Sequence, residues 1–96
     1  MKQHFVYILG NKRNGDFYIA TTNNIKRRIY EHQNKLIEGF TKKHDLNKLL
    51  YFEKASDAKT ALEKEKQLRD WSRRWKIDLI EKDNPEWEDL TKDLPV

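Results

Sequence analysis

The sequence contains no cysteine, which excludes disulfide frameworks, thiolate metal sites and cysteine nucleophiles. No apolar run approaches the roughly 20 residues that a membrane-spanning helix requires. The apolar residues near the N-terminus, from Phe5 to Leu9, are too few for the hydrophobic region of a signal peptide. Together these absences predict a cytoplasmic protein that does not enter a membrane.

The chain is short and highly charged. Its 96 residues are enough for one small domain, 1–96, and leave no room for a second. Charged residues make up 38% of the chain and hydrophobic residues 36%, so the core must be compact. Aromatic residues make up 11%, which argues against a wholly disordered chain.

Charge is distributed unevenly along the chain. Lysine and arginine number 20, and aspartate and glutamate number 16, which gives a formal net charge of +4. Residues 81–96 contain 2 of the basic and 6 of the acidic residues, so the body before them carries a net charge of +8. A basic body is typical of a protein that binds a phosphate backbone, although many small proteins are basic for solubility alone.

The start of the chain predicts a β-hairpin. His4–Leu9 and Phe17–Ala20 are rich in β-branched and aromatic residues, which favours strands. The Asn14-Gly15 pair between them is a strong hairpin signal. The two strands are therefore expected to be antiparallel.

A helix and a third strand are expected next. Asn23 or Asn24 is expected to cap the helix, because an asparagine side chain accepts hydrogen bonds from the unpaired N–H groups of the first turn. The helix is expected to run to about Glu38 and to end at Gly39, which tolerates a left-handed conformation. After a loop, Lys48–Glu53 predicts the third strand.

The second half of the chain predicts further helices. Ser56 is expected to cap a second helix that runs to about Trp71, and Arg73–Lys82 predicts a third. Asn84-Pro85 is expected to end the third helix and to begin a final helical turn, so that 84–96 forms an acidic helical tail. The order β-β-α-β-α-α predicts an α/β fold of the α+β type, with a three-stranded sheet flanked by three or more helices.

His32 lies on the apolar face of the first predicted helix. At about 100° per residue, this face consists of the large aliphatic residues Ile25, Ile29 and Leu36. Arg28 lies at the edge of the face, one turn from His32, whereas Arg27 points towards solvent or a phosphate. A single histidine in such a place is more often hydrogen-bonded to the backbone than functional.

The second predicted helix carries a carboxylate, Glu65, among its apolar residues. These residues are Ala58, Ala61, Leu62 and Leu68, whereas Glu63 points to solvent. Burial of an unpaired charge costs on the order of several kcal/mol, so Glu65 is expected to pair with a cation, bind a metal ion or have a shifted pKa. A salt bridge to a nearby Lys or Arg and a divalent metal site remain equal alternatives.

Two tyrosines lie on the predicted hairpin. Tyr7 and Tyr18 can project to one face of the sheet if the strands pair in register. Strand tyrosines are usually core residues. On a face shared with Arg28, His32 and Glu65, however, they supply hydroxyls for proton transfer beside a cation, an imidazole and a metal ligand. This combination of groups is suited to phosphodiester hydrolysis.

The sequence elements around these residues resemble one family, the GIY-YIG nuclease superfamily. The elements are Val6-Tyr7-Ile8, Tyr18-Ile19-Ala20, Arg28, His32 and Glu65. The chain is similar to the small stand-alone branch of the superfamily, whose members are described as uncharacterised proteins or candidate endonucleases. Phrases typical of that branch are Gly39-Phe40-Thr41-Lys42-Lys43, Trp75-Lys76 and Asn84-Pro85-Glu86-Trp87.

The resemblance implies a three-stranded sheet flanked by helices, cleavage of a DNA phosphodiester bond, and one divalent cation, Mg²⁺ or Mn²⁺. It implies that Glu65 holds the metal ion and that Arg28 stabilises charge on the scissile phosphate. It also implies that Tyr7 and Tyr18 position or deprotonate the attacking water, with His32 assisting proton transfer.

Two positions depart from the superfamily pattern, and a third matches it weakly. Val6 and Ala20 stand where the two motifs have glycine. A positive φ at Ala20 would cost roughly 1 kcal/mol or more and shift Tyr18, whereas an ordinary φ would only crowd the substrate. Asn84 matches a polar position near the end of some members and is a candidate accessory residue.

The function predicted first is a metal-dependent DNA endonuclease that recognises DNA structure or backbone rather than a long sequence. The candidate phosphate contacts are six basic residues, Arg13, Arg27, Lys42, Lys43, Arg73 and Arg74. Two alternatives stay open: a non-catalytic nucleic-acid-binding module with the nuclease fold, and a protein-interaction domain suggested by the acidic tail. A protein partner or a second copy of the chain is compatible with each.

Overall fold

The structure is a computed structural model that describes residues 3–13, 15–37, 39 and 44–94. Its elements are β1 (His4–Gly10), β2 (Phe17–Thr22), α1 (Ile25–Gln33), β3 (Lys48–Ala55), α3 (Ala58–Asp70), α4 (Arg73–Asp83) and the short 3₁₀ helix η1 (Leu90–Asp93). The three strands form one antiparallel sheet in the order β2-β1-β3. The predicted α+β class and the order β-β-α-β-α-α are confirmed. None of the described helices is long and apolar enough to cross a membrane.

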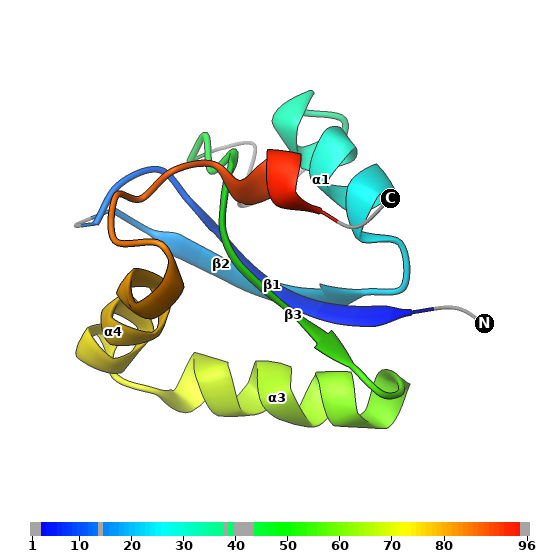
Figure 1. Cartoon of the computed structure of the whole chain (residues 1–96). Coiled ribbons are helices and arrows are strands. Elements are labelled where there is room, and N and C mark those ends of the chain that lie inside the picture. The colour runs from blue at the N-terminus through cyan, green and yellow to red at the C-terminus, as the bar shows by residue number, and fades with distance from the viewer. Residues whose placement is uncertain (1–2, 14, 38, 40–43, 95–96) are drawn as a thin grey trace.

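The helices cover both faces of the sheet (Figure 1). α1 and η1 lie on one face, and α3 and α4 lie on the other. β1 is the central strand, and all of its residues from Phe5 to Gly10 are buried. Its sequence is an unbroken run rather than an alternation of apolar and polar residues, because both of its faces are covered.

Side chains of β1 therefore point alternately into two separate cores. The core under α1 contains Phe5, Tyr7 and Leu9, together with residues of the other elements: Ala20, Ile25, Ile29, Leu46, Leu49 and Leu94. The core under α3 and α4 contains Val6 and Ile8, together with Ile19, Leu50, Tyr51, Ala61, Leu68 and Ile80.

β3 contains a bulge opposite Ile8 and Leu9. Tyr51 pairs with Ile8 and Leu49 pairs with Leu9, so Leu50 is an extra residue without a partner on β1. The bulge allows Leu50 and Tyr51, which are adjacent in the chain, to be buried in the same core, whereas regular alternation would place them on opposite faces.

The first helix ends earlier than the predicted Glu38, at Gln33. Lys35 adopts a left-handed conformation, with φ of 56°. Its N–H donates to the carbonyl of His32 (3.1 Å), and the N–H of Leu36 donates to the carbonyl of Glu31 (2.9 Å). This Schellman arrangement ends a helix, and it is built here on lysine instead of the expected Gly39. Leu36 is consequently 65% exposed and is not part of the apolar face.

Two other predicted helix starts differ in the structure. Asp57 rather than Ser56 caps α3, since its carboxylate accepts from the N–H of Thr60 at 2.7 Å. No helix begins at Pro85. The last helical turn is η1, which Asp89 caps by accepting from the N–H of Thr91 at 3.0 Å.

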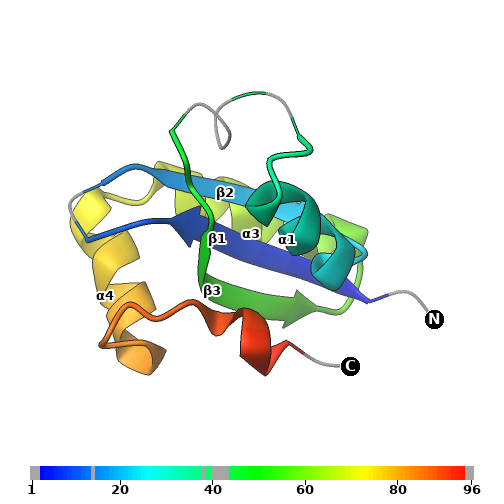
Figure 2. The same cartoon turned by 90° about the horizontal axis from the view of Figure 1, so that it is seen from above.

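The tail runs back along the sheet and connects β3 to α1 (Figure 2). One carboxylate oxygen of Asp89 accepts from the N–H of Leu49 at 3.2 Å, and the other accepts from the side-chain amide of Gln33 at 2.8 Å. Gln33 also donates to the carbonyl of Asn47 (2.9 Å) and to the hydroxyl of Thr91 (3.0 Å). The end of α1 is thus fixed by residues more than 50 positions later in the sequence.

Candidate functional site

Tyr7 and His32 meet in the core under α1. Tyr7 is buried in the middle of β1, and His32 is buried in the last turn of α1. The Tyr7 hydroxyl lies 3.1 Å from Nε2 of His32, within hydrogen-bonding distance. Ile25 and Ile29 anchor the same face of α1 in this core, so the helical repeat also directs His32 towards the sheet.

Tyr18 completes a cluster of three rings. Tyr7 pairs with Ala20 and Tyr18 pairs with Leu9, so the two tyrosines are diagonal neighbours on one face of the sheet. The ring centroid of Tyr18 lies 6.5 Å from that of Tyr7 and 5.4 Å from that of His32. The expectation that both tyrosines share one face is met by this register.

Burial keeps Tyr7 and His32 uncharged near neutral pH. The pKa of Tyr7 is raised, chiefly by burial and then by the Tyr18 phenol. The pKa of His32 is lowered, first by burial and then by the positive charge of Arg28. The hydrogen bond between the two side chains therefore joins two neutral groups.

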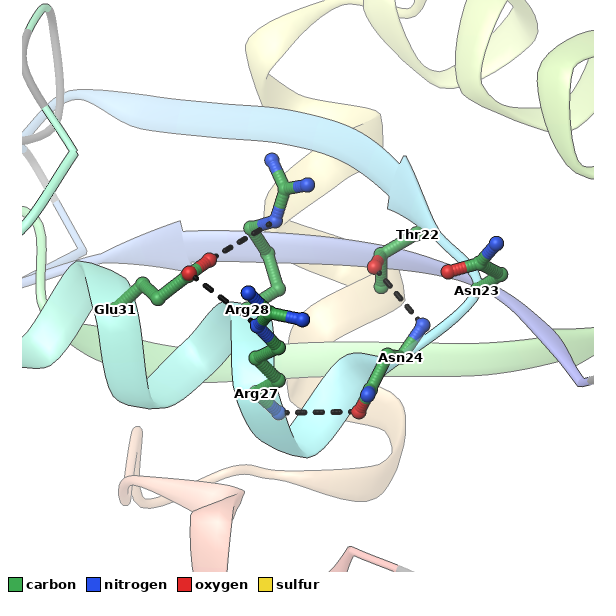
Figure 3. Close-up of a pocket in the computed structure, with 6 residues that line it drawn as sticks. All are labelled: Thr22, Asn23, Asn24, Arg27, Arg28 and Glu31. Carbon is green, nitrogen blue, oxygen red and sulfur yellow. Dashed lines mark hydrogen bonds and ion pairs between the residues drawn. The ribbon is translucent and has the colours of Figure 1, made fainter.

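Arg28 lies beside this cluster in an open hollow at the start of α1 (Figure 3). The hollow has a volume of about 470 Å³ and is lined by Thr22, Asn23, Asn24, Arg27, Arg28 and Glu31. The Glu31 carboxylate faces both arginines, because it lies 3.6 Å from Nε of Arg27 and 3.6 Å from Nε of Arg28. One carboxylate thus neutralises part of the positive charge of this hollow.

Glu65 lies on α3, on the other side of the sheet from α1 (Figure 1). Its side chain is only 17% exposed and lies 3.4 Å from Nε of Arg69. Arg69 also donates from Nη2 to the carbonyl of Ile19 at 3.0 Å, which attaches this ion pair to β2. Of the alternatives for Glu65, the salt bridge is present in the structure.

Charged residues of both α1 and α3 nevertheless act on the pKa of the Tyr7 hydroxyl. Arg28 lowers the pKa of Tyr7, whereas Glu65 and Glu31 raise it, in addition to the larger effect of burial. The Glu65 carboxylate therefore lies within electrostatic reach of Tyr7, although it belongs to the opposite layer.

The two layers come together at β2, which is an edge strand. On the α3 side, one hollow beside β2 is lined by Thr21, Thr22, Ala61 and Leu62 among others, and another by Phe17, Tyr18, Ile19, Arg69 and Lys76. On the α1 side, Thr22 lines the hollow that contains Arg28. The candidate site is therefore the surface around the β2 edge rather than one enclosed cleft.

This surface suits a metal ion that keeps most of its own water. Among the described residues, no group of three or more His, Cys, Asp or Glu side chains is placed to hold a metal ion. Glu65 supplies a single carboxylate close to the site. Mg²⁺ is commonly bound by one or two carboxylates together with waters and substrate phosphates, and the residues present fit that mode.

Four of the six predicted phosphate contacts, Arg13, Arg27, Arg73 and Arg74, interact with other groups of the protein, and Arg73 and Arg13 do so at the connection between β1 and β2. Arg73 donates to the carbonyls of Arg13 (2.7 Å) and Gly15 and lies 4.6 Å from the centroid of the Phe17 ring. Arg13 itself lies 3.1 Å from a carboxylate oxygen of Glu81. Arg73 therefore holds the connection between β1 and β2 against α4, which Figure 2 shows side by side.

The other predicted contacts lie in different surroundings. Arg74 lies 3.3 Å from the carboxylate of Asp78, and the exposed Arg27 lines the hollow described above. Lys42 and Lys43 lie outside the described residues.

Asn84 is used within the fold. It is 4% exposed and ends α4. Its side-chain amide donates to the carbonyls of Leu50 (3.2 Å) and Glu88 (2.9 Å), and its side-chain oxygen accepts from the N–H of Glu88 at 3.0 Å. These hydrogen bonds give Asn84 a structural role, which is an alternative to the accessory role predicted from the sequence.

Ala20 has an ordinary strand conformation. Among the described residues, positive φ angles occur at Lys35, Asp45, Trp87 and Gly39, and not at Ala20. Its methyl group is buried in the core under α1, opposite Tyr7 on the neighbouring strand. The φ angle therefore excludes the expected possibility of backbone strain at Ala20.

Three residues of the site were missed by sequence reasoning. Glu31 and Arg69 have signals that could have identified them, because each lies three or four residues from a helix partner of opposite charge. Lys76 has no such signal, because only the packing of α4 brings it to the hollow beside Tyr18.

Comparison with known proteins gives consistent results. The profile of the GIY-YIG catalytic domain matches residues 3–78. A UPF0213 protein of Staphylococcus saprophyticus is 31% identical over 80 residues, which cover 83% of this chain and 96% of that protein. The solution structure of a UPF0213 protein from Bacillus halodurans is similar with a TM-score of 0.58 and 28% identity, covering 94% of this chain and 95% of that one.

Proposed function

Because the chain belongs to the GIY-YIG catalytic-domain family, we propose that it is a metal-dependent endonuclease that hydrolyses phosphodiester bonds in DNA. The observation that carries the proposal is the set of groups that surround the Tyr7 hydroxyl. This hydroxyl is hydrogen-bonded to His32 and lies in the electrostatic field of both Arg28 and Glu65. The net charge of +4 and the arginines beside β2 support an anionic substrate.

In the proposed reaction, water attacks the phosphorus atom, a new P–O bond forms, and the bond to the leaving oxygen breaks. Tyr7 orients the attacking water through its hydroxyl. As the water attacks, its proton passes to the Tyr7 oxygen while the Tyr7 proton passes to Nε2 of His32, which is neutral and can accept it. Solvent water protonates the leaving oxygen.

The remaining groups stabilise charge. Arg28 interacts with the phosphoryl oxygens, on which negative charge increases in the transition state. To do so it leaves Glu31, which lies 3.6 Å away in the unbound protein. Tyr18 packs against His32 and keeps its ring oriented towards Tyr7.

Glu65 is the proposed ligand of the divalent cation, Mg²⁺ or Mn²⁺. When bound, such an ion polarises a phosphoryl oxygen. Arg69 holds the Glu65 carboxylate at the β2 edge until then, since it contacts both Glu65 and the carbonyl of Ile19.

The test compares two glutamates of the same helix. Glu65→Gln is expected to abolish Mn²⁺-dependent cleavage of branched, nicked and duplex DNA and to weaken Mn²⁺ binding measured by calorimetry. Glu63→Gln is the matched control, since Glu63 is exposed on α3. Cleavage by the Glu65→Gln variant at the wild-type rate would overturn the assignment of Glu65. Salt-sensitive DNA binding by the wild-type protein without cleavage would support the alternative of a non-catalytic module.

A further inference from the structure

Arg27 and Arg28 share one counterion in the hollow at the start of α1. The Glu31 carboxylate lies 3.6 Å from Nε of each arginine, and it faces Arg27 with Oε2 and Arg28 with Oε1. Among the residues that line the hollow, two positive charges therefore face one negative charge. Figure 3 shows that the terminal nitrogens of Arg28 point away from Glu31. The hollow thus keeps positive charge and hydrogen-bond donors that Glu31 does not use.

The contacts between Glu31 and the two arginines are long. At 3.6 Å they exceed the range of a hydrogen bond. Arg73, by contrast, donates to a backbone carbonyl at 2.7 Å. Exposed ion pairs add little to the stability of a protein, so the separation of Glu31 from Arg27 and Arg28 has a small cost in free energy.

The polar groups beside the arginines are already used at the start of the helix. The Asn24 side chain accepts from the N–H of Arg27 at 3.2 Å, and the Thr22 hydroxyl accepts from the N–H of Asn24 at 3.0 Å. These backbone donors are therefore occupied. The donors that the hollow offers to a ligand are the guanidinium groups, whose planar fork matches the oxygens of a phosphate.

The two arginines differ in their relation to the proposed catalytic cluster. Arg28 is the less exposed of the two, and its charge acts on both Tyr7 and His32. Arg27 precedes it in the chain, is more exposed and lines the same hollow. A DNA strand carries one phosphate per nucleotide. With one phosphate at Arg28, the neighbouring phosphate of that strand is the anion available to Arg27.

We propose that Arg27 binds the phosphate next to the scissile one on the same DNA strand, and that Glu31 is an internal competitor that the two phosphates displace. The inference rests on the proposed function, because it assigns a second phosphate contact to the same site. Arg27 is thus a positioning residue, which fixes the strand over Arg28. Glu31 lowers the affinity of the unbound protein for DNA, since both arginines must leave it before they bind phosphates.

Binding without metal tests this site separately from catalysis. In EDTA, fluorescence anisotropy is measured with a labelled DNA duplex at salt concentrations from about 50 to 200 mM. Glu31→Gln is expected to tighten binding roughly 2- to 30-fold, the range that corresponds to the loss of two exposed ion pairs. Glu63→Gln is the control, because it makes the same change in net charge at an exposed position of α3. It is expected to change the affinity little, since salt screens a distant exposed charge.

Arg27 is tested against the lysine that precedes it. Arg27→Gln is expected to weaken duplex binding about threefold or more at the lowest salt concentration and to reduce the slope of log affinity against log salt by about 1, because one phosphate contact is lost. Lys26→Gln removes the same charge from an exposed residue of the same helical turn that does not line the hollow, and it is expected to leave the slope unchanged. Arg27→Lys keeps the charge and is expected to retain most of the affinity, which separates a lost contact from a fold defect.

The two proposals fail in different ways. Equal affinities of Glu31→Gln and Glu63→Gln, or equal salt slopes of Arg27→Gln and Lys26→Gln, would overturn the inference. The nuclease assignment stands in that case if cleavage still depends on Glu65. If the variants bind DNA as expected but the wild-type protein does not cleave it, the phosphate contacts are supported and the endonuclease assignment is wrong. If the wild-type protein does not bind the duplex at low salt, the inference is overturned.

Discussion

Nε2 of His32 lies 3.1 Å from the hydroxyl of Tyr7, in a core that would otherwise be apolar. A buried polar pair of this kind is stable only while its hydrogen bond is satisfied and both groups remain uncharged. The pair therefore makes both the stability and the proposed chemistry of the protein dependent on pH.

The pKa of His32 is expected to respond in opposite directions to its two charged neighbours. It is lowered by burial and by Arg28, and raised by Glu31. Arg28→Gln is therefore expected to raise the His32 pKa and Glu31→Gln to lower it, which an NMR titration of the imidazole signals measures. Identical titration curves in both variants would show that Arg28 and Glu31 do not act on His32.

The decrease of the cleavage rate at acidic pH is expected to follow the protonation of His32. A neutral His32 accepts the proton, so the rate is expected to fall as pH decreases through a pKa below the ordinary value of about 6.5. Folding stability should fall over the same range, because the unfolded chain binds the proton more tightly than the native state. His32→Asn is expected to reduce this acid-side loss of stability, measured by urea unfolding at several pH values.

Tyr7 is expected to limit stability at the alkaline end. Its pKa is raised above the ordinary value of about 10, so the unfolded chain loses the phenol proton at lower pH than the native protein. The stabilisation is complete below pH 10 and is lost as pH rises further. Tyr7→Phe should reduce this alkaline loss, measured as the slope of unfolding free energy against pH. Tyr51→Phe should do the same, because burial and Glu53 raise the Tyr51 pKa. A slope that neither variant changes would contradict the assignment.

Arg28 and Arg27 are adjacent but are expected to have different effects. Arg28→Lys keeps the charge but loses the planar fork at the scissile phosphate, so kcat is expected to fall by about 10² or more. Arg27→Lys should leave kcat within about twofold, because the Arg27 side chain is 76% exposed, whereas Arg28 is 46% exposed and is the arginine whose charge acts on Tyr7 and His32. Steady-state kinetics on one DNA substrate compares the two. Equal losses in kcat would place Arg27 in the reaction as well.

Asp89 is expected to be important for stability although it lies outside the candidate site. It accepts from Leu49, Gln33 and Thr91, so Asp89→Ala removes the acceptor of the Leu49 and Thr91 N–H groups, whereas Gln33 keeps its bonds to Asn47 and to the Thr91 hydroxyl. The expected loss is about 1–3 kcal/mol in unfolding free energy, measured with urea. Asp93→Ala, at an exposed position of η1, is the control and should change stability by less than about 0.5 kcal/mol.

Local patterns in the sequence predicted the elements whose signals are local. The strands follow from their β-branched and aromatic residues and α3 from its helical spacing, and Tyr7 and Tyr18 share a face because strand pairing fixes the side on which each residue lies. The end of α1 was predicted wrongly because Lys35 adopts a left-handed conformation that its residue type does not signal.

Contacts between distant segments were out of reach. Helical spacing placed Glu65 among apolar residues and Arg69 one turn away, but it did not indicate that Arg69 would also donate to the carbonyl of Ile19. The face of the sheet that α3 covers depends on how the chain crosses the sheet after β3. No local sequence pattern indicates this crossing.

The hydrogen bonds from Gln33 to Asp89 and Thr91 bear on how the protein is made. During synthesis, β1, β2 and α1 leave the ribosome long before their partners in the tail exist. The end of α1, and with it the turn that carries His32, cannot reach its final anchoring until residue 91 has emerged. Newly made protein should therefore acquire resistance to proteolysis late, after translation has passed that point.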